Sequence, residues 1–426
     1  MELAGDYNSS MFETRYVQVR GQTTAYEVAE VFREYGDAYR AAYRVTPQQA
    51  RVLGALGACR TRALGGKVYE CRACGAVEFA YLSCRDRHCP KCQKFARAQW
   101  VEAQKVYLLP IPYFHVVFTT DHAINAWVPA NQATLYNLLF ETAAATLKAF
   151  AARELGGELG ITAVLHTWGQ TLPLHVHVHC VVTGGALSFD GQRWVRCALG
   201  YLFDIVAVSA AFRDAFCAGL VRLAAQGQLV GVTGDEARPT VAAMQAKNWE
   251  VFAKPFETPE TVMEYLSRYV HAVAISNSRL THMGDGQVRF TYHDNQDGGK
   301  QKEMTVSAVE FIRRFLWHVL PDGFVRIRYY GLHHSAARKS KLPRARALLG
   351  LPPALPKVTQ LVLAVWLADV VGVELHRCRF CGAVGTLSYR GEVAQMPWVW
   401  LWLKVLFGWL FAEPWRGANV NASVPA

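Results

Sequence analysis

Residues 174–180 read LHVHVHC, and this stretch constrains the fold more strongly than any other part of the chain. Side chains alternate along a β-strand, so His175, His177 and His179 would share one face and the apolar residues between them the other. An apolar face of this kind predicts a strand packed in a sheet. Burying three imidazoles without partners is costly, so the pattern favours a bound metal ion over solvated histidines on a surface strand.

Two histidines separated by one residue supply adjacent ligands and leave other coordination positions open, as phosphodiester chemistry requires. We expect a third ligand from the neighbouring stretch AVLHTWGQ. His166 is the first candidate and Gln170 the second, because both would point to the same face of a strand. Mixed nitrogen and oxygen ligation suits Mg²⁺ or Mn²⁺ with retained water.

Two cysteine pairs with the spacing of zinc ligands lie in the N-terminal part of the chain. They are Cys71-x-x-Cys74 and Cys89-x-x-Cys92, separated by fourteen residues. Each pair can bind one side of a tetrahedral Zn²⁺, and the loop between them allows both pairs to meet. The sequence therefore predicts one structural zinc site on these four thiolates, against the alternative of four unliganded buried cysteines.

The remaining cysteines carry weaker signals. Cys59, Cys84 and His88 lie just before or inside this loop, as alternative ligands or as part of a second site. Cys378-x-x-Cys381 has no second pair near it in the sequence, and we expect it to be structural. The cysteines lack the wide spacings of a disulfide framework and the first residues lack a secretory signal, so we expect a reducing, cytoplasmic compartment.

The charge of the chain points to a polyanionic partner. Lys and Arg outnumber Asp and Glu by 45 to 34, a formal net charge of +11, which suits nucleic acid but also fits a merely basic soluble enzyme. Basic residues gather around the cysteine pairs, and we interpret Arg85, Arg87 and Lys91 as candidate DNA contacts. The alternative is a solvated charged surface.

The pattern of apolar residues divides the chain into three regions. A length of 426 residues, 52% of them hydrophobic, predicts two or three domains. Beyond the cysteine-rich part, a strand, a helix and a hairpin follow one another, which implies an α+β fold with helices packed on a mainly antiparallel sheet. We expect a helical zinc-binding, DNA-contacting domain over 1–108, a catalytic domain over 109–345 and a C-terminal region over 346–426.

The C-terminal region contains the tryptophan-rich stretch Met396–Phe411. This stretch is shorter than the roughly 20 residues that span a bilayer, and it contains a lysine and a glycine. We therefore expect a packed or interfacial helix and no membrane partner.

Tyrosines four residues apart occur in MEYLSRYVHAVAIS, at Tyr265 and Tyr269. On a helix they would stand one above the other and away from the apolar face, bordered by Arg268, a candidate phosphate contact. Such a pair on its own is more typical of packing. Together with a metal that polarises phosphate, phenols that attack it would complete a transesterification site, leaving a 5′-phosphotyrosine and a free 3′-hydroxyl.

These motifs resemble those of the HUH-class rolling-circle transposases of the insertion-sequence ninety-one type. The resemblance covers most of residues 25–350 and is carried by three motif groups in the same order: SCRDRHCPKCQ, then LHTWGQ with HVHVHC, then YLSRYVHAVAISNSRL. The tail after residue 390 has no counterpart in it.

The resemblance implies an HUH endonuclease-like fold that nicks and rejoins single-stranded DNA at transposon ends. It implies that His177 and His179 chelate the catalytic metal, that Tyr265 and Tyr269 act in turn as nucleophiles, and that the cysteine-rich domain binds zinc and DNA. A plasmid replication initiator or relaxase with the same site, and a non-catalytic zinc-dependent DNA-binding protein, are the alternatives.

Overall fold

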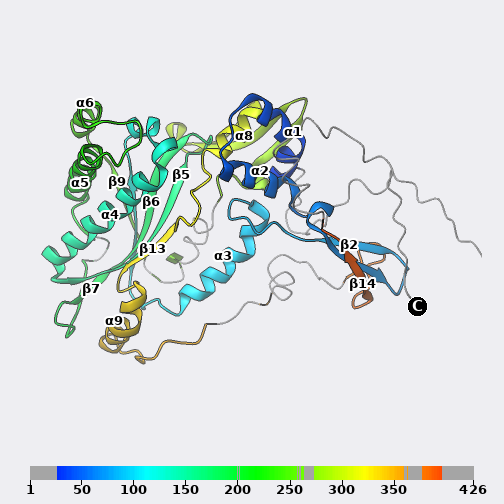
Figure 1. The fold of residues 1–426 in the computed structure, drawn as a ribbon. Helices are drawn as coiled ribbons and strands as arrows, with labels where there is room; N and C mark the ends of the chain where they lie inside the picture. The colour runs from blue at the N-terminus through cyan, green and yellow to red at the C-terminus, as the bar shows by residue number, and fades with distance from the viewer. Residues whose placement is uncertain are drawn as a thin grey trace, which may run out of the picture.

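The computed structural model describes residues 26–198, 200, 202–256, 258, 261–262, 273–358, 362 and 377–395. Its largest sheet has five strands in the order β13-β5-β6-β3-β9, and every neighbouring pair is antiparallel (Figure 1). The strands are β3 (Tyr113–Thr119), β5 (Gly160–Trp168), β6 (Leu174–Thr183), β9 (Val251–Phe256) and β13 (Ile327–Gly331). The predicted hairpin is β5–β6, so the α+β class with a mainly antiparallel sheet is confirmed.

Three helices cover one face of this sheet (Figure 1): α4 (Val128–Leu155), α5 (Ile205–Ala225) and α6 (Gly234–Gln245). Local chemistry sets two of their ends. The Asp204 carboxylate accepts the first backbone N–H groups of α5, and α4 ends at Gly156, whose φ of 57° is left-handed. Beneath these helices the apolar face of β6, Val176, Val178 and Cys180, is fully buried, as the alternation predicts.

A second core joins segments that are far apart in the sequence. Helices α1 (Val28–Ala42) and α2 (Pro47–Ala58) pack with α8 (Ala308–Leu316) and with a three-stranded meander, and Phe32 of α1 meets Phe315 of α8 edge to face at 5.0 Å. The meander consists of β10 (Leu280–Gly284), β11 (Gln287–Asp294) and β12 (Lys300–Ser307). This core crosses the predicted boundary at residue 108, because the amphipathic faces of α1 and α8 cover each other.

The cysteine-rich part, expected within a helical domain, contains a small sheet. Strands β1 (Gly66–Cys71) and β2 (Val77–Tyr81) form a hairpin, and β14 (Leu387–Val393) pairs antiparallel with β1 (Figure 1). Helix α3 (Pro90–Lys105) follows, with Cys89 as its N-cap residue and Pro90 in its first turn. Through β14, residues 387–393 therefore pack with the cysteine-rich part.

The remaining elements are short. Helix α9 (Ser335–Leu348) follows β13, and a small three-stranded sheet flanks α4. Its strands are β4 (Gly157–Glu158), β7 (Gly185–Ser188) and β8 (Trp194–Arg196). No helix within the described ranges is both long and apolar enough to cross a membrane, and Met396–Phe411 lies outside those ranges.

The core beneath α5 provides a test of the fold. Phe118 of β3 is fully buried and meets Phe212 of α5 edge to face at 4.8 Å. Phe118→Ala should lower the free energy of unfolding by about 3–5 kcal/mol, because it removes buried aromatic surface and leaves a cavity. Urea unfolding followed by circular dichroism measures this. Phe189, 71% exposed, is the control, and Phe189→Ala should change stability by less than about 0.5 kcal/mol. Equal losses would contradict this packing.

Candidate active site on the histidine strand

Three predicted histidines converge on the sheet face opposite α4 and α5. The ring nitrogens of His166, His177 and His179 lie within 4.8 Å of one another, and all three residues are buried. The strand register explains this, because His166 of β5 stands directly opposite His177 of β6. We refer to these residues as the histidine cluster.

Two other predicted residues lie outside the histidine cluster. The Gln170 side-chain oxygen accepts the backbone N–H of His293 at 3.4 Å, so the second candidate for third ligand is engaged with β11. His175, at the start of β6, has its Nδ1 3.2 Å from Nε2 of His122. The structure thus groups His166, and not Gln170 or His175, with His177 and His179.

Hydrogen bonds orient two rings of the cluster. Nδ1 of His177 donates to the carbonyl oxygen of His175 at 2.7 Å, and Nδ1 of His179 lies 2.8 Å from Nε2 of His115. Metal-binding imidazoles usually use their second nitrogen in this way, which orients the ring toward the ion. His115 was not predicted from the sequence. The signal for it is the alternation in YFHVV, which puts His115 opposite Val181 and on the face of His179.

Burial keeps these imidazoles neutral. It lowers the pKa of His177 to about 3 and of His115 to about 4, and it lowers the pKa of His179 well below its ordinary value. At neutral pH these rings are therefore neutral, the protonation state in which histidine binds a metal. Three imidazoles suit Mn²⁺ better than Mg²⁺, which prefers oxygen ligands, so the donor set fits a divalent transition-metal ion.

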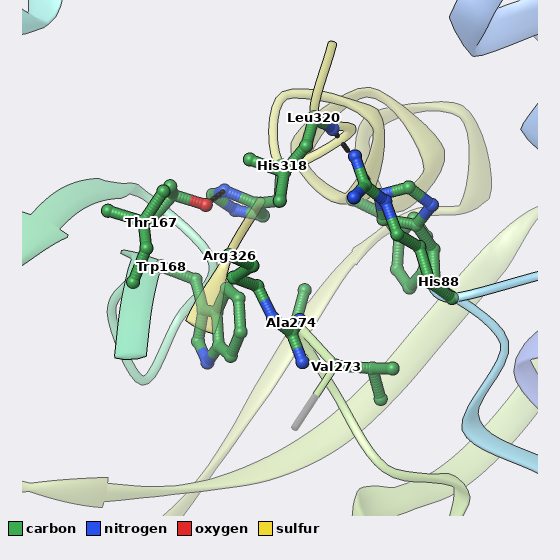
Figure 2. A pocket seen from close by; sticks show the side chains of 11 residues that line it. His88, Thr167, Trp168, Val273, Ala274, His318, Leu320 and Arg326 are labelled. Atoms are coloured by element: carbon green, nitrogen blue, oxygen red, sulfur yellow. Dashed lines mark hydrogen bonds between the residues drawn. The ribbon is translucent and has the colours of Figure 1, made fainter. Parts of the chain in front are cut away.

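A cavity adjoins the histidine cluster. Trp168 stacks on His166 with ring centroids 4.6 Å apart, and it lines a cavity with Thr167, Ala274 and Arg326 (Figure 2). Burial lowers the pKa of Arg326 to about 10, which leaves its guanidinium charged at neutral pH. On the opposite wall His88 accepts the backbone N–H of Leu320 at 3.3 Å, and its Nδ1 bonds Asp86, so His88 belongs to neither cysteine group.

Tyr265, Tyr269 and Arg268 lie outside the described residues, but the chain on either side of them is described. Val262 is fully buried with Val164 and Val181, and Val164 stands opposite His179 in the β5–β6 pairing, so this contact is on the histidine face. After the segment, Val273 and Ala274 line the cavity beside Trp168 (Figure 2). The chain before residues 263–272 is therefore buried on the histidine face of the sheet, and the chain after them lines the cavity beside Trp168.

Eight of the eleven cysteines form two groups of four. This corrects the single site predicted on Cys71, Cys74, Cys89 and Cys92. Within each group the sulfur atoms lie within 4.8 Å of one another. The first group is Cys59, Cys84, Cys89 and Cys92; the second is Cys71, Cys74, Cys378 and Cys381. The two predicted pairs fall in different groups because β1 pairs with β14, which brings the distant pair to Cys71 and Cys74.

The three described candidate DNA contacts differ in their surroundings. Arg87 donates to the carbonyl oxygens of Phe324 and Pro321 at 2.7 and 2.9 Å, and Lys91 forms an ion pair with Glu27. These two side chains hold the cysteine-rich part against its neighbours. Arg85 is exposed, with a left-handed φ of 54°, and is the one of the three that presents its charge to solvent.

The protein is thus an α+β protein that has a buried histidine cluster on its antiparallel sheet and two groups of cysteines elsewhere, each of which could hold a metal ion. Comparisons with known proteins identify the family. Residues 160–341 match a family model described as "Putative transposase", and residues 31–120 match the IS91-type "Transposase zinc-binding domain". No solved structure matches the chain.

Two relatives extend the similarity over most of the chain. "Putative transposase y4qJ" of Sinorhizobium fredii is 45% identical over 389 residues, which are 88% of this chain and 98% of the relative. The transposase for insertion sequence element IS801 of Pseudomonas savastanoi pv. phaseolicola is 30% identical over 366 residues, 79% of this chain and 83% of the relative. The chain belongs to the IS91 family of transposases, with DNA as its partner and a zinc-binding domain.

His115 provides a test of the cluster. His115→Ala should weaken Mn²⁺ binding about 10- to 100-fold, because His179 would lose the hydrogen bond that orients its ring. Titration of the full chain with Mn²⁺, with the free ion followed by electron paramagnetic resonance, measures the affinity. His333 is the matched control, since it is equally buried but bonds Thr162 away from the cluster. If His333→Ala weakens binding as much, the effect is one of folding and the assigned role is wrong.

Proposed function

We propose that this transposase nicks and rejoins single-stranded DNA at transposon ends by a rolling-circle mechanism, through covalent 5′-phosphotyrosine intermediates on Tyr265 and Tyr269. The observation that carries the proposal is the convergence of His166, His177 and His179 on one buried sheet face. Val262, three residues before Tyr265, is buried on that same face, which supports an approach of the tyrosines to the cluster.

The chemistry divides between the cluster and the phenols. A divalent ion held by the three imidazoles would polarise a phosphate oxygen of the strand. The phenolate oxygen of one tyrosine attacks the phosphorus, the new O–P bond forms, and the bond to the 3′-oxygen breaks and leaves a 3′-hydroxyl. Because one phosphoester replaces another, the reverse attack by a 3′-hydroxyl rejoins DNA without a nucleotide cofactor. Two tyrosines allow a second junction to open while the first remains attached.

The nucleophiles are tested by trapping the adduct. The full-length protein, Mn²⁺ and a labelled single-stranded oligonucleotide carrying a transposon end should give an SDS-resistant protein–DNA adduct. Tyr265→Phe, Tyr269→Phe together should abolish this adduct, because neither residue then has a phenol oxygen. Tyr292→Phe, which changes a tyrosine of β11, is the control and should leave the adduct intact. An undiminished adduct in the double variant would refute the assignment.

The histidines are tested by separating binding from cutting. His177→Ala, His179→Ala should still bind the oligonucleotide in a mobility-shift assay but lose at least about 100-fold in cleavage rate, because the charge on the phosphate would no longer be stabilised. A variant that cuts as fast as the wild type would place the metal elsewhere. A variant of His122, which contacts His175 outside the cluster, should retain cleavage.

A replication initiator or relaxase would use the same site at a replication origin. Membership of the IS91 family favours transposition, since both relatives described above are named as transposases. The flanking DNA distinguishes the two functions, because short ends with a hairpin on both sides of the gene indicate a mobile element. If the double Phe variant processes DNA normally in cells, the protein acts through DNA binding alone.

A further inference from the structure

Two seven-residue segments, one near each end of the described chain, have almost the same sequence and the same backbone. CRACGAV begins at Cys71 and CRFCGAV begins at Cys378. In the first, Gly75 N–H bonds the Cys71 carbonyl at 2.8 Å, and Cys71 N–H bonds the Ala76 carbonyl at 2.9 Å. The second repeats both bonds at 2.9 Å, and the glycine of each segment has a left-handed φ, 71° and 75°. Each segment is thus a knuckle that presents two thiols.

The two knuckles face each other. The sulfur atoms of Cys71 and Cys381 are 3.7 Å apart, as are those of Cys74 and Cys378. Pairing of β1 with β14 brings them together, since Cys71 stands opposite Leu387 in the register. We propose that these four cysteines bind a structural Zn²⁺ of their own, in addition to a Zn²⁺ on Cys59, Cys84, Cys89 and Cys92.

The sulfur spacing fits zinc and does not fit disulfides. A disulfide requires about 2.05 Å between its sulfur atoms. A tetrahedral Zn²⁺ with bonds of about 2.3 Å separates its sulfur ligands by about 3.8 Å, close to the distances above. Four thiolates are also the soft donor set that selects zinc. The Thr386 hydroxyl lies 3.1 Å from the Cys71 sulfur, so a polar neighbour fixes the position of one ligand of the group.

Polar contacts align the two knuckles, and little apolar surface is buried along β14. Arg379, inside the second knuckle, donates its backbone N–H and its Nε to the Glu78 carboxylate at 2.8 and 2.9 Å. Arg390 and Glu70 form an ion pair at 2.7 Å across the same strands. No residue of β14 is buried, so apolar packing contributes little to holding this strand. We infer that the ion fixes the C-terminal strand to the N-terminal hairpin, as metals do in sheets too small for a core.

Zinc stoichiometry tests the proposal. Native mass spectrometry of the full-length wild type should show two zinc ions per chain, and Cys378→Ser, Cys381→Ser should show one. Cys59→Ser, Cys92→Ser should also retain one. Cys217, buried in the main core outside both groups, is the control, and Cys217→Ser should retain two. A wild type with one ion, or a Cys378→Ser, Cys381→Ser variant with two, would overturn the assignment.

Two further measurements keep the proposal testable if the serine variant folds poorly. Wild-type protein refolded with Co²⁺ should absorb as two tetrahedral tetrathiolate centres per chain, and one centre would contradict the second site. The single variant Cys381→His keeps Cys378 and supplies an imidazole as the fourth ligand, so it should bind the second ion. In hydrogen exchange, the amides of residues 387–393 should lose protection in Cys378→Ser, Cys381→Ser and regain it in Cys381→His. Unchanged protection after loss of that ion would refute its role in fixing β14.

Discussion

The structure depends on the alternation of side chains along β6. One face of this strand supplies valines and a cysteine to the core beneath α4 and α5, and this burial fixes the register of the whole sheet. The other face, on the side of the sheet away from α4 and α5, must then carry His177 and His179. Because β6 is the central strand, β5 and β3 pair with it on either side and add His166 and His115. A one-residue shift would turn the imidazoles into the apolar core, so packing and the histidine cluster are specified by one pattern.

The sequence allowed prediction of the features that a local pattern encodes. Alternation placed β6, and the pattern of a strand, a helix and a hairpin placed β3, α4 and the β5–β6 pair. The sequence did not allow prediction of which cysteines share a site, because strand pairing joins the Cys71 and Cys378 knuckles across about 300 residues. The signal that could have found this is the near-identity of CRACGAV and CRFCGAV, since two similar knuckles are the usual halves of one zinc site. His115 was missed because the alternation in YFHVV places it on the face of His179 only when the pairing of β3 with β6 is known.

Charge illustrates a different limit of the sequence. A net charge of +11 indicates a polyanionic partner but does not locate its contact surface. Arg87 is satisfied by two carbonyl oxygens in the segment that leads into β13, and His88 bonds Leu320 in the same segment. These contacts fix the loop between Cys84 and Cys89 against the sheet that carries the histidine cluster. Arg87 and His88 therefore help to hold the cysteine-rich part against the segment that leads into β13.

Contacts also fix the described chain on either side of the segment that carries the two tyrosines. Before it, Val262 is anchored on the histidine face of the sheet; after it, Ala274 and Ile275 enter the core formed by α1, α2 and α8. Asn277 strengthens the second anchor, because its side-chain oxygen accepts the backbone N–H of Val28 at the start of α1 at 3.1 Å. Residues 263–272 thus connect two cores, and the relative position of these cores determines where their ends lie. If Tyr265 and Tyr269 attack phosphate beside the histidine cluster, the N-terminal helices are needed for catalysis as well as for the zinc-binding region, because they hold one end of the segment that carries both nucleophiles.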